Sequence, residues 1–198
     1  MIKNVIFDMG KVLIDYDFDK FFQNMGFEPN THTLDEANEE ILLFESGKFG
    51  KTEFYNIMKH IYGFDKTMDE FYTHWCDVFW EIPEMLEIAK NLKDKFDLYI
   101  FSNTDEVHFP YIWEKFPSIQ FFGDNLMLSH ELGHVKPDIS AFDEILDKFS
   151  LNPFETLFID DKADNIQSAY AVGFSTIHHT DIENTKKELK RLLHLEDK

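Results

Sequence analysis

Short, continuous runs of apolar residues alternate with longer segments in which apolar residues recur every three or four positions. The first short run, residues 4–7, ends in Asp8 and turns at Gly10. Continuous apolar runs of this length are typical of central parallel strands, whereas half-exposed strands alternate apolar and polar residues. Further strands are predicted at residues 98–101, 126–128, 156–159 and 175–177.

The segment after the first strand has only helical periodicity. Apolar residues recur at helical spacing in four successive stretches, and Gly26, Gly47 and Gly63 follow the first three as C-terminal stops. Four amphipathic helices without an intervening strand predict a helical insert, which we place at residues 15–82. The predicted helices cover residues 18–25, 35–45, 54–61 and 68–79.

From Pro83 onward, strand and helix signals alternate. Pro83 opens a helix, because proline is tolerated in a first helical turn. The alternation predicts an α/β fold, a Rossmann-like parallel sheet flanked by helices and carrying an inserted four-helix cap. The sheet domain would consist of residues 1–14 and 83–198, and the cap of residues 15–82.

Composition narrows the range of partners and the location. The 198 residues are 43% hydrophobic and include 22 Phe, which is enough for a packed core. The formal net charge of -19 disfavours nucleic acid and anionic membranes as partners, and no stretch reaches the ~20 apolar residues of a membrane helix. The single cysteine, Cys76, and the lack of a signal-peptide pattern predict a cytoplasmic protein.

Three predicted strands end in groups suited to chemistry: Asp8, Ser102–Asn103 and Asp160–Asp161. The carboxyl ends of parallel strands share one edge of the sheet, where open α/β folds bind their ligands. Carboxylates gathered there repel one another, and a hard cation with oxygen ligands, such as Mg²⁺, relieves the repulsion. Lys136 adds a positive charge at the start of a helix. Carboxylate, hydroxyl, lysine and Mg²⁺ together suit phosphoryl transfer.

These residues resemble, in the same order, the four sequence motifs of the haloacid dehalogenase-like (HAD) hydrolase superfamily. The insert between the first two motifs resembles a C1-type cap, and the motifs are most similar to those of bacterial α-D-glucose-1-phosphate phosphatases. Phe7-Asp8-Met9-Gly10 is similar to motif I, Ser102-Asn103 to motif II, Lys136-Pro137 to motif III, and Asp160-Asp161 with Asp164 to motif IV.

The resemblance implies a Mg²⁺-dependent phosphatase acting on a small phosphorylated metabolite, such as the sugar phosphate α-D-glucose 1-phosphate. Asp8 would attack phosphorus and form an aspartyl phosphate. Ser102, the Asn103 main chain and Lys136 would hold the phosphoryl oxygens. The implied metal site consists of Asp8, the Gly10 carbonyl and Asp161, with Asp160 as a ligand or as a neighbour supporting one.

One position departs from the family pattern. Most phosphatases of the superfamily carry a second aspartate two residues after the nucleophile, as general acid and base, whereas this chain has Gly10. General acid–base catalysis contributes about 10²–10⁴-fold, so substrates with good leaving groups would suffer least. We consider Asp15 and Asp17 as replacements. Glu45 is interpreted as a helix-end charge or as a contact to a sugar hydroxyl.

Three alternative functions remain open at this point. A haloacid dehalogenase would use Asp8 on carbon without a metal, which the acidic pair Asp160–Asp161 disfavours. A phosphomutase would need the acid that Gly10 lacks. A phosphometabolite-binding protein without turnover would be compatible with Gly10.

Overall fold

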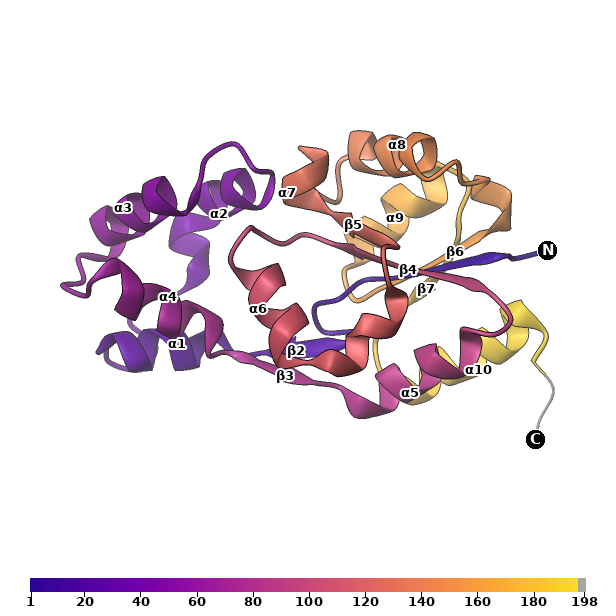
Figure 1. The fold of residues 1–198 in the computed structure, drawn as a ribbon, viewed down its shortest axis with the longest axis horizontal. Coiled ribbons are helices and arrows are strands. Elements are labelled where there is room, and N and C mark those ends of the chain that lie inside the picture. Colours follow the sequence, from indigo (N-terminus) through magenta and orange to yellow (C-terminus); the bar gives the residue numbers. More distant parts are fainter. Residues whose placement is uncertain (196–198) are drawn as a thin grey trace.

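The computed structural model describes residues 1–195 as a parallel sheet flanked by helices, with a helical insert beside it (Figure 1). All four strand pairs of this sheet are parallel, and the order β5-β4-β1-β6-β7 places β1 (Asn4–Phe7) in the middle. The predicted α/β class is therefore confirmed. The remaining strands are β4 (Asp97–Ser102), β5 (Leu126–Leu128), β6 (Thr156–Asp160) and β7 (Ser175–His178).

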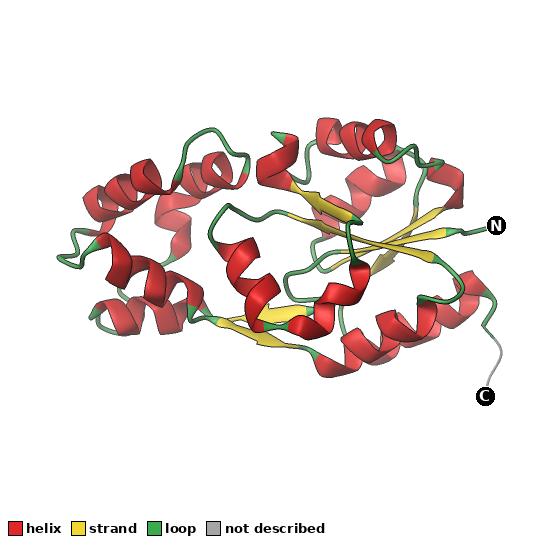
Figure 2. Ribbon diagram, in the orientation of Figure 1, coloured by secondary structure: helices red, strands yellow, loops and turns green. Residues whose placement is uncertain are grey.

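Helices cover both faces of the sheet, which is why its central strands are continuously apolar (Figure 2). Successive residues of a strand point to opposite faces, so Val5 and Phe7 join one hydrophobic cluster and Ile6 joins another. Within residues 1–195, no helix combines the length and apolar character needed to cross a lipid bilayer. The first cluster contains α5 (Pro83–Leu92), α6 (His108–Lys115) and α10 (Ile182–Leu193), and the second contains α7 (Ser129–Leu132), α8 (Ile139–Lys148) and α9 (Ala163–Ala171).

The helical insert has a hydrophobic core of its own, made largely of aromatic rings. Phe44 and Phe54 stack with ring centroids 4.2 Å apart, and Phe54 also contacts the buried Trp75. A separate core is what an inserted unit requires, while the exact boundaries at residues 15 and 82 stay a prediction. The helices are α1 (Phe18–Met25), α2 (Asn38–Glu45), preceded by a 3₁₀ turn (Leu34–Ala37), α3 (Lys51–Tyr62) and α4 (Met68–Cys76).

A two-stranded antiparallel ribbon joins the insert to the sheet domain. In it, β2 (Ile14–Tyr16) pairs with β3 (Phe79–Glu81). The prediction of a helix reaching Phe79 is wrong, because α4 ends at Cys76 and Phe79 begins β3. Strands of three residues are too short to show a period, and Phe79 also fits the helical spacing of the preceding segment. The sequence likewise did not predict α6, α7 or the 3₁₀ turns Pro117–Phe122 and Pro153–Glu155.

The end of α2 rests on α7 of the sheet domain, and Figure 1 shows these two helices side by side. The Ser129 hydroxyl donates to the main-chain carbonyl of Glu45 at 2.5 Å. Two residues on, Gly47 has a φ of +68°, and a Cβ placed on it would lie only 2.4 Å from the carbonyl oxygen of His130. Glycine at position 47 therefore permits the close approach of the insert to the sheet domain.

We expect Gly47→Ala to destabilise the protein more than Gly63→Ala does. Both glycines have a φ of +68°, so alanine at either position costs about 1–2 kcal/mol of backbone strain. At Gly47 the added methyl group also collides with a backbone oxygen, whereas nothing lies within 4 Å of one added at Gly63. Urea unfolding of the two variants measures the difference. Equal losses of stability in Gly47→Ala and Gly63→Ala would show that α7 moves away from the added methyl group without a loss of free energy.

Candidate active site

The strand ends that carry polar side chains meet at one edge of the sheet. Asp8 follows β1, while Ser102 ends β4 and Asp160 ends β6, the two strands that pair with β1 on either side. One carboxylate oxygen from each of Asp8, Asp160 and Asp161 lies within 4.8 Å of the others. The structure therefore brings together the residues that the sequence placed at this edge.

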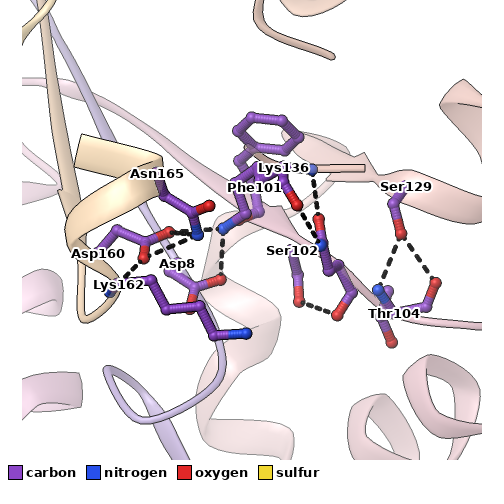
Figure 3. Close-up of polar contacts among 10 residues, drawn as sticks. Asp8, Phe101, Ser102, Thr104, Ser129, Lys136, Asp160, Lys162 and Asn165 are labelled. Carbon is purple, nitrogen blue, oxygen red and sulfur yellow. Dashed lines mark hydrogen bonds and ion pairs between the residues drawn. The ribbon is translucent and has the colours of Figure 1, made fainter. Parts of the chain in front are cut away.

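Lys136 lies at the centre of the cluster, almost fully buried at 3% exposure (Figure 3). Its ammonium donates to Asp8 Oδ1 at 2.7 Å, to Asp160 Oδ2 at 2.7 Å and to the Phe101 carbonyl at 2.8 Å. Three acceptors satisfy the three protons of the ammonium. Burial lowers the pKa of Lys136, but the two carboxylates outweigh this effect and raise it. Lys136 is therefore charged and rigidly held.

The carboxyl group of Asp8 lies in an electrostatically unfavourable position. Burial raises its pKa, Lys136 opposes the shift, Asp160 and Asp161 add to it, and the resulting pKa is about 7. Burial and the charge of Asp160 also raise the pKa of Asp161. An excess of carboxylates over cations at one point favours either protonation or a bound cation. The oxygen atoms of Asp8 and Asp161 fit a hard cation such as Mg²⁺.

Asp160 is bound differently from the other two aspartates. It is fully buried, and besides the ammonium of Lys136 it accepts hydrogen bonds from the Lys162 main-chain N–H at 2.8 Å and from Asn165 Nδ2 at 3.0 Å to each oxygen. Both of its oxygens thus have protein donors, which favours fixing Lys136 over direct metal contact. Sequence reasoning assigned no role to Asn165, because an amide in the first turn of a helix is usually on the surface.

The side chain of Asn103 binds the main chain of the loop that carries Lys136. Its Nδ2 donates to the Lys136 carbonyl at 2.9 Å, and the Lys136 main-chain N–H donates to Asn103 Oδ1 at 2.8 Å. The amide side chain therefore positions Lys136. The contact with a phosphoryl oxygen that the sequence predicts for Asn103 would be made by its main chain instead. The hydroxyl of Ser102 donates to the Asn103 carbonyl at 3.2 Å, and both residues line the cavity described next.

A cavity of about 570 Å³ opens over the cluster, between the sheet domain and the insert. This volume lies within the range of small-molecule sites. Of the residues predicted as nucleophile, phosphate contacts or metal ligands, Asp160 alone does not line it. Those that do are Asp8, Gly10, Ser102, Asn103, Lys136 and Asp161. The side of the cavity that faces the insert is largely apolar and comprises Tyr16, Phe18, Leu34, Asn38, Ile41, Leu42, Glu45, Trp75 and Phe79.

The ring of Tyr16 fills the space above Gly10. A Cβ placed on Gly10 would lie 3.1 Å from Cε1 of Tyr16 and 4.0 Å from Oδ2 of Asp8. The ring is held in place by Phe79 and by the Lys11 ammonium, which lies 4.4 Å from its centroid. An aspartate at position 10 would therefore compete with Tyr16 for the same volume.

Asp15 and Asp17, the replacements for the missing acid considered from the sequence, have other partners. Asp15 Oδ1 accepts from the Lys11 ammonium at 2.5 Å and from the Tyr16 main-chain N–H at 2.8 Å. Asp17 caps α1 by accepting from the Asp19 main-chain N–H at 2.9 Å. Neither aspartate lines the cavity. These contacts favour structural roles for both aspartates over the supply of a proton.

His108 is a cavity residue that sequence reasoning missed. It forms a buried ion pair with Asp105, 2.9 Å from Nδ1 to Oδ2, and its Nε2 donates to the Trp75 carbonyl at 3.1 Å. Burial lowers the pKa of His108, but Asp105 outweighs this effect and raises it. The imidazolium connects the start of α6 to the end of α4. A single histidine cannot be recognised as functional from the sequence when no other ligand or catalytic residue lies at a characteristic spacing from it.

Three comparisons identify proteins similar to this chain. Residues 2–173 match the family model of the haloacid dehalogenase-like hydrolases. A D-ribitol-5-phosphate phosphatase from Bacteroides thetaiotaomicron is 31% identical over 206 residues, covering 98% of this chain and 99% of the relative. A sesquiterpene phosphatase from Aspergillus oryzae is 26% identical, covering 96% of each protein. A crystal structure of a HAD family enzyme from B. thetaiotaomicron in complex with magnesium has a TM-score of 0.78 at 26% identity, covering 89% of this chain and 92% of that one.

We expect magnesium to stabilise the protein more at about pH 8 than at about pH 5.5, because a carboxyl group must lose its proton before it binds a cation. Asp8 and Asp161 have raised pKa values, so without metal the folded state binds more protons than the unfolded state and loses stability as the pH rises. Metal binding reverses this loss. Thermal unfolding with Mg²⁺ or EDTA at both pH values measures the effect.

The matched variants for this measurement are Asp161→Asn and Asp143→Asn. Each removes one carboxylate, but Asp143 is exposed on α8 and does not line the cavity. The magnesium-dependent shift should disappear in the first variant and persist in the second. A shift of equal size in both variants would contradict metal binding at Asp161.

Proposed function

The chain belongs to the haloacid dehalogenase-like hydrolases, and on that premise we propose that it is a Mg²⁺-dependent phosphatase. Its substrate would be a small phosphomonoester, a sugar or sugar-alcohol phosphate, hydrolysed through an aspartyl phosphate on Asp8. The observation that carries this proposal is the buried ammonium of Lys136, which donates to Asp8 and Asp160 beside a cavity of about 570 Å³. The phosphatase relatives and the magnesium complex support it.

In the proposed mechanism, Asp8 is the nucleophile. Lys136 opposes the rise in its pKa and so favours the ionised carboxylate that attacks phosphorus. The Ser102 hydroxyl and the Asn103 main-chain N–H would hold phosphoryl oxygens. Mg²⁺, held by Asp8, Asp161 and the Gly10 carbonyl, would supply neutralisation of the phosphoryl charge. Asp160 would act on Lys136 rather than on the metal, because its oxygens already have donors.

The proposed substrate is D-ribitol 5-phosphate or a polyol phosphate of similar size. The named relative acts on that compound, while the motif resemblance suggested α-D-glucose 1-phosphate. A cavity of about 570 Å³ has room for either molecule. Its largely apolar wall on the insert side would contact the carbon skeleton, and Tyr16, Asn38 and Glu45 are polar residues there that can bind hydroxyl groups.

Each alternative function predicts a different outcome. A dehalogenase would release halide from a haloacid without Mg²⁺, yet the raised pKa values of Asp8 and Asp161 favour a cation at this site. A phosphomutase would return the phosphoryl group to the sugar. A binding protein would retain phosphometabolites without turnover. The proposed phosphatase alone releases inorganic phosphate in a magnesium-dependent manner.

We expect Asp8→Asn to reduce phosphate release from D-ribitol 5-phosphate by more than about 10³-fold, since removal of a nucleophile abolishes covalent catalysis. Phosphate release from a panel that includes α-D-glucose 1-phosphate and 4-nitrophenyl phosphate, with Mg²⁺ or EDTA, measures the loss. Asp143→Asn is the control for removal of an exposed charge that does not line the cavity. Phosphate release that persists in Asp8→Asn, or that EDTA does not reduce, would refute the mechanism. No release from any substrate by the unmodified protein would refute the function.

A further inference from the structure

The proposed reaction lacks a residue for proton transfer. When an alcohol leaves phosphorus, its oxygen needs a proton, and water must later lose one as it attacks the aspartyl phosphate. At position 10 there is no side chain, and the space beside it belongs to the ring of Tyr16. Asp15 and Asp17 are bound elsewhere. A proton-transfer group must therefore come from another part of the cavity wall.

Glu45 lies on the opposite wall of the cavity, at the last position of α2. Its main-chain carbonyl accepts a hydrogen bond from Ser129, whose hydroxyl also accepts from the Thr104 main-chain N–H at 2.9 Å. Ser129 is completely buried, and the turn at Gly47 rests directly on His130. The insert therefore holds the backbone of Glu45 firmly against the sheet domain, so that its side chain is presented to the cavity from a fixed point.

The Glu45 carboxyl group has no hydrogen bond or ion pair with any residue in the described part of the chain, although it lines the cavity. The charged groups around it come from several elements: Asp105 and His108 after β4, Lys162 after β6, and Asp8 after β1. Burial is the largest effect and raises the pKa of Glu45 to about 7, with Asp105 adding to the shift and Lys162 and His108 opposing it. Such a group both gives and takes protons near neutral pH.

Two other polar residues of the cavity are less suited to this task. His108 already directs Nδ1 to Asp105 and Nε2 to the Trp75 carbonyl, so neither nitrogen faces the substrate. Burial and nearby carboxylates raise the pKa of Tyr16, so its hydroxyl can donate a hydrogen bond but does not become a base near neutral pH. Glu45 has neither of these restrictions.

We propose that Glu45 is the general acid and base of the phosphatase reaction, taking the place of the aspartate that Gly10 replaces. This inference rests on the function proposed above. As Asp8 attacks phosphorus, the bond from phosphorus to the leaving oxygen breaks and Glu45 gives its proton to that oxygen. In the second step, the Glu45 carboxylate takes a proton from the attacking water, and the bond between phosphorus and Asp8 breaks. The products are the alcohol and inorganic phosphate, and Glu45 is again protonated.

The test compares substrates whose leaving groups differ in basicity. The 4-nitrophenolate ion leaves without a proton, whereas the alkoxide of D-ribitol 5-phosphate needs one. We expect Glu45→Gln to slow single-turnover cleavage of D-ribitol 5-phosphate by about 10²–10⁴-fold and that of 4-nitrophenyl phosphate by less than about tenfold. In the unmodified protein, cleavage of the alkyl substrate should decline above about pH 7, and the variant should lack this decline.

Two control variants accompany Glu45→Gln. Glu39→Gln makes the same change at an exposed position in the first turn of the same helix, and its activity should stay within about twofold of the unmodified protein. Tyr16→Phe removes the hydroxyl of the other candidate proton donor in the cavity wall. If Tyr16→Phe rather than Glu45→Gln shows the leaving-group dependence, Tyr16 is the donor and the proposal is wrong.

The remaining outcomes separate this inference from the proposed function. An equal loss for both substrates in Glu45→Gln would indicate a structural role and overturn the proposal. Unchanged rates would also overturn it. In either case, phosphate release that is lost in Asp8→Asn would leave the phosphatase function intact. The absence of phosphate release from both substrates in the unmodified protein would instead reject the function on which the inference rests.

Discussion

The arrangement of the site depends on one buried ammonium group. Lys136 donates to Asp8 after β1, to Phe101 within β4 and to Asp160 at the end of β6. A single side chain thus connects a loop to the three central strands. Burying charged groups has a large desolvation cost, and close hydrogen bonds from every proton of the ammonium offset it. Removing one partner of such a cluster typically costs about 3–5 kcal/mol, because the charge that remains is uncompensated. The cluster therefore stabilises the strand ends and holds Asp8 in place.

The helical insert forms the walls of the cavity that the edge of the sheet does not provide. It enters and leaves through the β2–β3 ribbon, and it touches the sheet domain again where α2 meets α7 and where His108 binds the end of α4. Hydrogen bonds make two of these contacts, and His108 also stacks on Trp75 with ring centroids 4.9 Å apart. The partly buried Phe79 packs against both the aromatic core of the insert and the first cluster of the sheet domain. The cavity has walls from both parts, so its shape depends on how the two parts pack together.

In the proposed reaction, the two parts of the molecule have different tasks. The sheet edge holds the nucleophile and the phosphoryl group, and the insert supplies the group that protonates the leaving oxygen. In the usual arrangement of the family, both the nucleophile and the acid lie on one loop. Here the ring of Tyr16 lies against Gly10, and Glu45 lines the cavity from the insert. Recognition of the leaving group and transfer of its proton would then depend on the same surface.

The sequence by itself determined the class of fold, the helical insert and the convergence of Asp8, Ser102 and Asp160, because these follow from local periodicity and from the geometry of parallel strands. Only the tertiary structure decided which side chains from other helices line the site or bind its residues. Asn165, His108 and Glu45 come from three different helices, and no local pattern connects them. The missing acid at Gly10 was visible in the sequence. Its proposed replacement was not, since that depends on how α2 packs against α7.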